Sequence, residues 1–175
     1  MPVDAFLIFK EPGPGAVAIK GETRDEKMQK DGAFEIESFS FSIENTLNIG
    51  SASGGAGAGK AEFAEFSVTK SVDSGSPGLF KTCCTGGHYN DVRLHMRRAG
   101  GDHASTGKEF LIFKFKLVAV KSISWSEGDE VPKEDVVFEY GAIQINYARQ
   151  KNDGTHEAFQ QQHWSRVKNQ NVFEV

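Results

Sequence analysis

The segment formed by residues 66–101 constrains the fold more than any other part of the chain, because it combines two strand patterns with one helix pattern. It reads FSVTKSVDSGSPGLFKTCCTGGHYNDVRLHMRRAGG. Over residues 66–70 larger side chains alternate with Ser and Thr, and over residues 92–97 apolar side chains alternate with Arg and His. A period of two is typical of strands that bury one face. The segment therefore predicts two strands with a helix between them.

The helix between these strands has clear boundary signals. Ser76 offers a side-chain oxygen to the free N–H groups of a helix, and Pro77 suits the first helical position, where no N–H is needed. Gly86 and Gly87 follow, and glycine readily adopts the left-handed conformation that ends a helix. One apolar stripe is expected at helical spacing, formed by Leu79, Phe80, Cys83 and Cys84.

Strand patterns recur along the rest of the chain. Residues 34–43 change the phase of their alternation, so a β-bulge is expected near residues 37–38. Further strand signals cover residues 4–10, 17–20, 110–124 and 136–147, the last interrupted by Gly141. In the longest of these strands, one face is expected to hold Leu111, Phe113, Phe115, Leu117 and Ala119.

Length and composition fit one sheet-rich domain. The chain has 175 residues, 38% of them hydrophobic, and its 14 Phe can supply a core. With 19 Gly and little helical periodicity, a mainly β class is expected over residues 1–175. From about residue 151 the pattern fades into a polar C-terminal tail, whose candidate anchors are Phe159, Trp164, Val167 and Phe173.

Charge and hydropathy narrow the function. The net charge of -4 argues against a protein that binds nucleic acid by neutralising phosphates. No run of about eighteen apolar residues is present, so membrane insertion is not expected. The start, MPVDAFLIFKEPGPG, lacks the basic residues and long apolar core of a secretory signal peptide. A basic strand face without interleaved aromatic rings is interpreted as solvated or subunit-facing: Arg93, His95, Arg97 and Arg98.

No arrangement of residues predicts catalysis or metal binding. The G-x-S-x-G motif of hydrolases is missing, since residues 50–54 carry Ala where the nucleophile belongs. Cys83 and Cys84 are the only cysteines and are expected to be small buried hydrophobes. Cys84 and His88 lack the further ligands that zinc requires. We therefore expect no catalytic residue, no cofactor and no metal.

Residues 54–61, GGAGAGKA, satisfy the G-x-x-x-x-G-K pattern of a phosphate-binding loop, but their context does not. Ala61 stands where a hydroxyl should hold magnesium, and the residues that follow read as a strand instead of the required helix. A phosphate-binding enzyme is thus disfavoured. The segment is interpreted as an extended connection.

The order of several motifs resembles the haemolysin-coregulated protein family, Hcp, of type VI secretion systems. The resemblance covers nearly the whole chain, and no single motif in it is diagnostic. It includes the Val3–Phe6 start, KGET at residues 20–23, GGAGAGK at 54–60, FSVTK at 66–70, Asp73, Ser76-Pro77, CCTGGHY at 83–89, RRAGG at 97–101, EFLIFKFKLVAVKSIS at 109–124 and residues 134–147. The Pro/Gly loop at residues 11–15 is longer than the family's equivalent.

The resemblance implies a fold and a function. The fold would be a β-barrel of two packed antiparallel sheets with one short α-helix on the side. The function would be structural, as a tail-tube subunit that forms hexameric rings, stacks them into a hollow tube and carries effectors in the lumen. Partners would be other copies of the chain, secreted effectors, and the spike and sheath proteins of the apparatus. The protein would be cytoplasmic before assembly and then leave through the apparatus.

Two groups of residues receive roles from this resemblance. Ser38, Ser40 and Ser42 alternate with Phe39, Phe41 and Ile43. Periodicity alone makes the serine face an ordinary solvent-facing one, whereas the resemblance implies the inner surface of the ring. A contact between subunits or rings is expected at Gly54, Gly55, Gly57, Gly59 and Lys60. The alternative from another class is a small-ligand-binding β-barrel with an interior lined by Phe.

Overall fold

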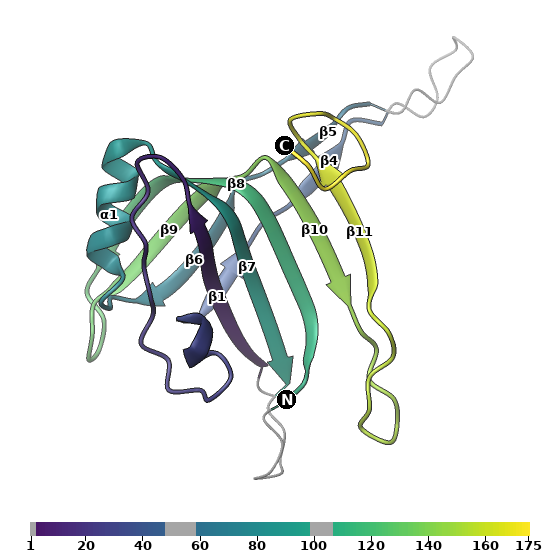
Figure 1. The fold of residues 1–175 in the computed structure, drawn as a ribbon, viewed down its shortest axis with the longest axis horizontal. Helices are drawn as coiled ribbons and strands as arrows, with labels where there is room; N and C mark the ends of the chain where they lie inside the picture. The colour runs from purple at the N-terminus through teal and green to yellow at the C-terminus, as the bar shows by residue number, and fades with distance from the viewer. Residues whose placement is uncertain (1–2, 48–58, 99–106) are drawn as a thin grey trace.

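The computed structural model describes residues 3–47, 59–98 and 107–175, and most of its regular structure is β-strand (Figure 1). The elements in chain order are β1 (Val3–Pro12), η1 (Gln29–Asp31), β2 (Phe34–Ile36), β3 (Ser38–Ser40), β4 (Ile43–Asn45), β5 (Ala61–Phe63), β6 (Phe66–Ser71), α1 (Ser76–Thr85), β7 (His88–Arg98), β8 (Glu109–Ser126), β9 (Lys133–Glu139), β10 (Ala142–Tyr147) and β11 (Gln160–Ser165). Among these described residues, no helix is long and apolar enough to cross a membrane.

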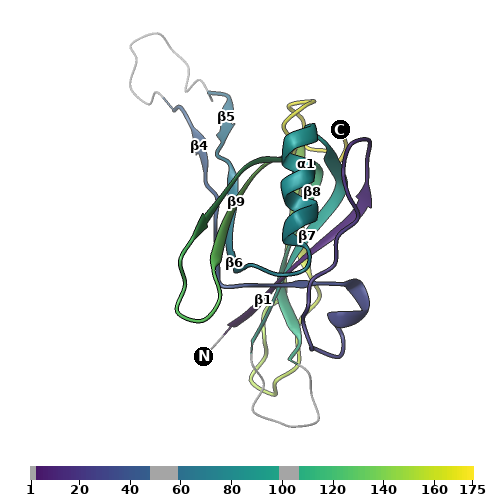
Figure 2. The same ribbon diagram turned by 90° about the vertical axis from the view of Figure 1, so that its left-hand side faces the viewer.

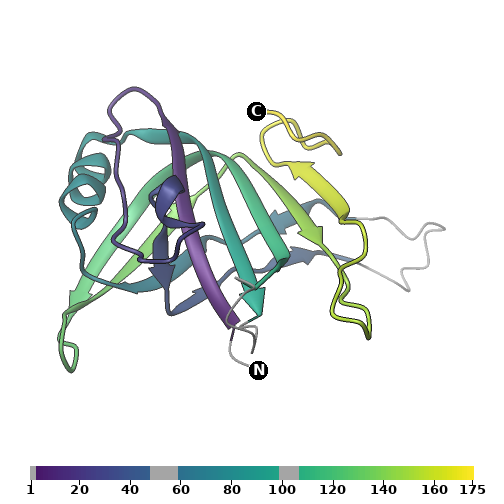
Figure 3. The ribbon, with the colours of Figure 1, turned by 60° about the horizontal axis from the view of Figure 1, so that its bottom comes forward.

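Nine strands form one antiparallel sheet that curls around the core (Figure 3). Its order is β2-β1-β7-β8-β9-β6-β3, and β10 joins it through β8 and carries β11 on its other side. The length of β8 permits this branching, because residues 111–116 pair with β10 and residues 119–126 pair with β9. β4 and β5 form a separate two-stranded sheet that projects from the body (Figure 2).

The mainly β class with one α-helix is confirmed, but the sheet is not closed into a barrel as expected. β2 pairs with β1, whereas β3 pairs with β6. Only Glu37 separates the two strands, and its N–H donates to the carbonyl of Thr69 at 2.9 Å. The chain thus changes sheet partner where the sequence predicts a bulge. The hydrogen-bonded ladder breaks there, so β2 and β3 stand at the two ends of the strand order and the sheet curls without closing into a barrel.

The face predicted for the longest strand is correct only in its first half. Phe113 and Phe115 are buried as expected, but Leu117 adopts a positive φ of 53° and is 37% exposed. This irregular residue shifts the alternation by one position, so Val118 and Val120 continue the buried face. The predicted inward positions of Leu117 and Ala119 are therefore wrong.

Helix α1 covers one side of the curled sheet (Figure 2). Its C-terminal prediction is confirmed, because Gly86 has a φ of 67° and donates its N–H to the carbonyl of Cys83 at 3.4 Å. The predicted capping role of Ser76 is wrong. Its Oγ accepts a hydrogen bond from the Asp73 N–H and donates one to buried Glu134.

The apolar stripe of α1 differs from the predicted one. Leu79 and Thr82 are buried and Cys83 is half-buried. Phe80 and Cys84, expected on the same stripe, are exposed. Because Thr82 donates to the Gly78 carbonyl and lies 3.2 Å from the Tyr89 hydroxyl, a polar side chain takes the inner position that the pattern assigned to apolar ones.

Aromatic rings fill the interior. Phe66 stacks on Phe115 with ring centroids 4.5 Å apart and on Phe138 with ring centroids 5.8 Å apart. Tyr140 contacts Phe115 edge-on. A smaller cluster of buried residues lies under the η1 loop and consists of Phe6, Ile8, Met28 and Ala33. Burial of these rings, together with the aliphatic side chains around them, supplies apolar driving force for folding.

Two segments differ from their predicted secondary structure. Residues 17–20 do not form a strand. Within the segment predicted as a polar tail, residues Gln160–Ser165 form β11, which pairs with all of β10. The sequence QQQHWS of β11 has no apolar alternation, so no local pattern could have indicated this strand.

Candidate assembly surfaces

The predicted serine face belongs to a wider hydroxyl-rich surface. Ser38 and Ser40 on β3 are exposed, and so is Ser42 just beyond it. Ser38 pairs with Thr69 of β6 and Ser40 with Ser67, whose hydroxyl lies 3.3 Å from that of Ser40. The alternation is confirmed for Phe39 and Phe41, which pack against the core, but not for Ile43, which is exposed.

The same surface continues across β9 and β8. Ser67 pairs with Val137 and Thr69 with Asp135, and the Thr69 hydroxyl donates to the Asp135 carboxylate. The next strand aligns Ser122 with Val137 and Ser124 with Asp135. We call this four-strand surface the hydroxyl face; its members are Ser38, Ser40, Ser67, Thr69, Ser122, Ser124, Asp135 and Val137.

The sequence predicts the hydroxyl face on one strand only. The signal in the other strands was present as alternating Ser and Thr over residues 67–71 and 122–126. Their alignment beside β3 depends on the pairing order of the sheet, which no local pattern reveals.

The β4–β5 arm, residues 43–45 with 61–63, carries a second candidate surface. Ile43 pairs with Phe63, and Glu44 pairs with Glu62, so two exposed carboxylates stand directly opposite each other. Like charges in this position are destabilising. Of the residues assigned here from sequence, Gly59 and Lys60 lie at the end of the arm, whereas Gly54, Gly55 and Gly57 lie outside the described residues.

Gly59 is required by a close backbone approach. A Cβ on this residue would lie 2.1 Å from the carbonyl oxygen of Thr46, the residue after β4. Glycine alone permits this contact without displacing the backbone. Lys60 is exposed beside it.

The root of the arm is tied to the body by Arg166 and Tyr140. Arg166 donates to the Glu139 carboxylate at 3.0 Å and to the Tyr140 carbonyl at 2.9 Å, and it lies over the ring of Phe63. The Tyr140 hydroxyl donates to the Ala64 carbonyl at 3.0 Å. Burial raises the pKa of Tyr140 to about 12, so this hydroxyl remains a donor at neutral pH. The arm therefore leaves the body in a defined direction.

Two cavities lie between the arm and the β10–β11 pair. One, of about 510 Å³, is bordered by Lys60, Glu62, Tyr140 and Arg166. The other, of about 330 Å³, has mostly apolar walls that include Ile43, Phe63, Ile143, Ile145, His163 and Trp164. We call the second cavity the arm groove.

Three of the four basic side chains predicted on the face of β7 contact carboxylates within the chain. Arg93 binds Asp91, and this contact raises the pKa of Arg93. Arg97 is buried and contacts Asp25 at 2.7 Å. His95 Nδ1 lies 2.9 Å from Glu109. Arg97 thus ties the sheet to the loop that carries Asp25, whereas Arg93 and His95 contact carboxylates within the sheet. Arg98 donates to the side chain of Gln150 at 2.8 Å.

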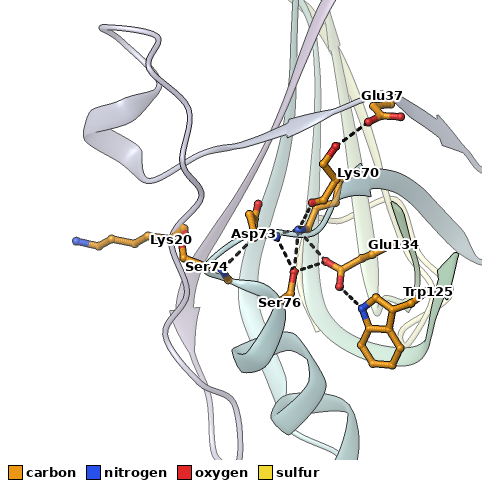
Figure 4. A network of polar contacts seen from close by, with 10 residues as sticks. Lys20, Glu37, Lys70, Asp73, Ser74, Ser76, Trp125 and Glu134 are labelled. Carbon is orange, nitrogen blue, oxygen red and sulfur yellow. Dashed lines mark hydrogen bonds and ion pairs between the residues drawn. The ribbon is translucent and has the colours of Figure 1, made fainter. Parts of the chain in front are cut away.

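A buried ionic network occupies the interior beside the helix (Figure 4). The Lys70 ammonium contacts Glu134 at 2.7 Å and Asp73 at 3.0 Å. Ser76 donates to one oxygen of Glu134, and Trp125 Nε1 donates to the other at 2.9 Å. These residues come from β6, α1, β8 and β9, so the network joins the helix to the sheet.

The cysteines do not match the predicted burial. Cys83 is half-buried and Cys84 is exposed, and both are free thiols. Within the described ranges, no three His, Cys, Asp or Glu side chains are grouped as a metal site would need.

Comparison with known proteins gives a consistent family. Residues 6–147 match the family described as type VI secretion system effector, Hcp. The protein hcp1 of Pseudomonas aeruginosa is 35% identical over 97 residues, a segment that covers 54% of this chain and 58% of that relative. The matched segment thus spans less than two thirds of this relative.

Solved structures agree in fold. One described as a type six secretion system protein has a TM-score of 0.83 and 25% identity, with 97% of this chain and 99% of the other covered. Hcp1 from Salmonella typhimurium has a TM-score of 0.72 at 23% identity over 98% of this chain and 100% of its own, which is a likeness of fold. Since the family model matches well over half of its residues, this chain belongs to the Hcp family of type VI secretion systems.

Proposed function

We propose that the chain is a structural subunit of the inner tube of a type VI secretion system. Six copies form a ring, rings stack into a hollow tube, and effectors travel in its lumen. The observation that carries this proposal is the hydroxyl face, which extends over four strands of a member of the Hcp family. The role is structural and not catalytic. The protein is cytoplasmic before assembly and then leaves through the apparatus.

The chemistry of the hydroxyl face supports its assignment to the lumen. Short hydroxyl groups form hydrogen bonds with many partners, and they present little charge or bulk to a passing protein. Asp135 is the one carboxylate of this face, and its contact with Thr69 ties it to the neighbouring strand. A wall of this type would hold varied cargo weakly.

The strand edges support ring formation. In the described part of the sheet, β11 pairs only with β10, and β3 only with β6. Unpaired edges expose backbone donors and acceptors that neighbouring copies can satisfy. A head-to-tail contact closes into a ring when its rotation fits. The projecting β4–β5 arm would contact the adjacent ring, and spike and sheath proteins would meet the ends and outside of the tube.

The filled interior disfavours the alternative of a small-ligand-binding barrel. A ligand barrel needs a central cavity. Here Phe66, Phe115, Phe138 and Tyr140 contact one another at the centre of the curled sheet.

Native mass spectrometry at micromolar concentration tests the proposal. We expect a hexamer with a mass six times that of the 19.2 kDa chain, and annular particles in negative-stain images. A persistent monomer would contradict the tube function.

A pair of substitutions on β3 tests the lumen assignment. Ser40→Lys is expected to retain hexamers and reduce retention of cargo, because the side chain is exposed on the hydroxyl face. The Phe41 ring packs against Phe113 with centroids 5.1 Å apart. Phe41→Asp is therefore expected to destabilise the subunit, because it would bury a charge. Loss of rings in Ser40→Lys with normal folding of Phe41→Asp would show that the two faces are reversed.

A further inference from the structure

The charged side chains at one end of the hydroxyl face neutralise each other. Glu37 accepts hydrogen bonds from the Lys133 ammonium and from the Ser71 hydroxyl. Lys133 also donates to the Ser71 hydroxyl at 3.3 Å. The hydrogen bond from Lys133 is the main cause of a lowered pKa at Glu37. The charge of this carboxylate is therefore balanced by a neighbour within the chain.

The other end of the face is balanced in the same way. On β6 and β9, the sequence positions two residues beyond the last members of the face are occupied by Glu65 and Glu139. Lys121 contacts both carboxylates, and Arg166 donates to Glu139 at 3.0 Å. Two cations thus accompany two carboxylates at this end.

Asp135 differs from these groups, because it lies in the middle of the face. It is exposed on β9, in a row between Thr69 of β6 and Ser124 of β8. The Thr69 hydroxyl, a neutral group, donates a hydrogen bond to its carboxylate. Lys133, two residues before Asp135 on the same strand, is engaged with Glu37. Among the described residues, Asp135 is thus the carboxylate of the hydroxyl face whose charge no cation balances.

An apolar side chain lies beside this carboxylate. Val137 is half-buried and follows Asp135 by two residues, so the two side chains lie on the same face of β9. Two residues of a strand span about 6.5–7 Å. The cross-strand neighbours of Val137 are Ser67 and Ser122. The centre of the face therefore presents one carboxylate and one apolar group, surrounded by hydroxyl groups.

A basic side chain matches this pair of groups. The guanidinium of arginine can form two parallel hydrogen bonds with a carboxylate, and the hydrocarbon stem of arginine or lysine covers apolar surface. A basic side chain extended along β9 would place its charged head at Asp135 and its stem over Val137. The surrounding hydroxyl groups can donate to, or accept from, the backbone of the same segment. An acidic segment would instead bring like charges together at Asp135.

From this arrangement we propose that Asp135 is the specificity-determining residue of the hydroxyl face, which binds extended polypeptide segments that carry arginine or lysine. The proposal rests on the proposed tube function and names the chemistry of the cargo. In a ring this carboxylate recurs in every subunit, so the potential within the lumen favours cationic segments. Each contact is exposed to water and therefore weak, which allows the cargo to be released.

Peptide binding to the full chain tests this proposal. The probes are fluorescent peptides of Gly and Ser that differ only at one central residue, which is Arg, Gln or Glu. At low salt the Arg peptide is expected to bind about fivefold more tightly than the Gln peptide, and the Glu peptide more weakly than both. Salt at about 0.5 M should reduce these differences, because exposed charges are screened. Fluorescence anisotropy measures the affinities.

Substitutions on and off the face locate the preference. Asp135→Asn keeps an acceptor for the Thr69 hydroxyl but loses the charge, so the Arg and Gln peptides should bind equally. Asp129→Asn is the matched control, because Asp129 is an exposed carboxylate of the β8–β9 turn, outside the face, and the preference should remain. Lys133→Gln leaves the charge of Glu37 unbalanced and should strengthen binding of the Arg peptide. Circular dichroism checks that the variants fold.

The outcomes separate this proposal from the proposed function. A preference for the Arg peptide that depends on Asp135 supports the assignment. Equal binding of the peptides, no binding of any of them, or a preference that survives in Asp135→Asn overturns it. Rings that lack the preference leave the tube function intact. A monomer that shows the preference contradicts the tube function and retains the assignment of Asp135.

Discussion

The most constrained individual residues of the chain are Lys70 and Glu134, which are charged and almost completely inaccessible to water. Moving an ion out of water costs several kcal/mol, and the cost is recovered only if contacts satisfy the whole group. Lys70 achieves this with two carboxylates, the Ser71 carbonyl and the face of the Phe34 ring. The FSVTK, Asp73 and Ser-Pro motifs are therefore parts of one buried network.

Removal of Lys70 should be strongly destabilising. Lys70→Met leaves Glu134 buried without its cation, and we expect the free energy of unfolding to fall by about 3–5 kcal/mol. Urea denaturation measures the change. Lys121→Met is the matched control, because it removes an exposed ion pair with Glu65, and it should change stability little. Equal effects of the two substitutions would contradict a structural role for the network.

Glu109 should make stability depend on pH. The contact with His95, whose Nδ1 lies 2.9 Å from the carboxylate, is the main cause of a lowered pKa at Glu109, and it outweighs the opposing effect of partial burial. A carboxyl group with a lowered pKa in the folded state stabilises that state above its unfolded pKa of about 4.5. This contribution should be lost as the pH falls through the folded pKa. Glu109→Gln should therefore show a weaker loss of stability below about pH 4.5 in thermal unfolding, and an unchanged slope would refute the effect.

At the scale of elements, the turn from α1 to β7 contains two glycines, and each is required for a different physical reason. Gly86 needs a left-handed backbone, and a Cβ there would have no neighbour within 4 Å. Gly87 has no such backbone requirement, but a Cβ would lie 2.3 Å from the Gly15 backbone. The Pro/Gly loop after β1 therefore packs directly on this turn.

The two alanine substitutions should differ accordingly. Gly86→Ala is expected to cost about 1 kcal/mol, the conformational penalty alone. Gly87→Ala should cost more, because the loop around Gly15 has to move. Thermal unfolding of the two variants measures the order, and a larger loss for Gly86→Ala would contradict this account of the turn.

For the whole molecule, the direction of the arm relative to the sheet decides how it can reach another copy. Arg166 links the C-terminal segment, the corner between β9 and β10, and Phe63 at the root of the arm. It thus acts as a positioning residue for the arm.

Replacement of Arg166 should affect stacking more than ring formation. Arg166→Gln loses the contact with Glu139 and the cation–π contacts, so the arm should become less well oriented. We expect hexamers of normal mass, with fewer stacked rings in electron micrographs at high protein concentration. The matched control is Lys168→Gln, two residues after Arg166, which breaks an exposed ion pair with Glu174. Loss of hexamers in Arg166→Gln would instead place this residue in the ring contact.

The sequence by itself determined the mainly β class, the single helix with its glycine stop, the break near residue 37 and the alternation around Ser40. These features depend on backbone preferences and on periodicity, which act over a few residues. Only the tertiary structure decided the position of β11, the shift at Leu117 and the buried pairing of Lys70 with Glu134. It also aligned hydroxyl groups from four strands. These features depend on which distant segments pack together, and a strand carries no local mark of its neighbours.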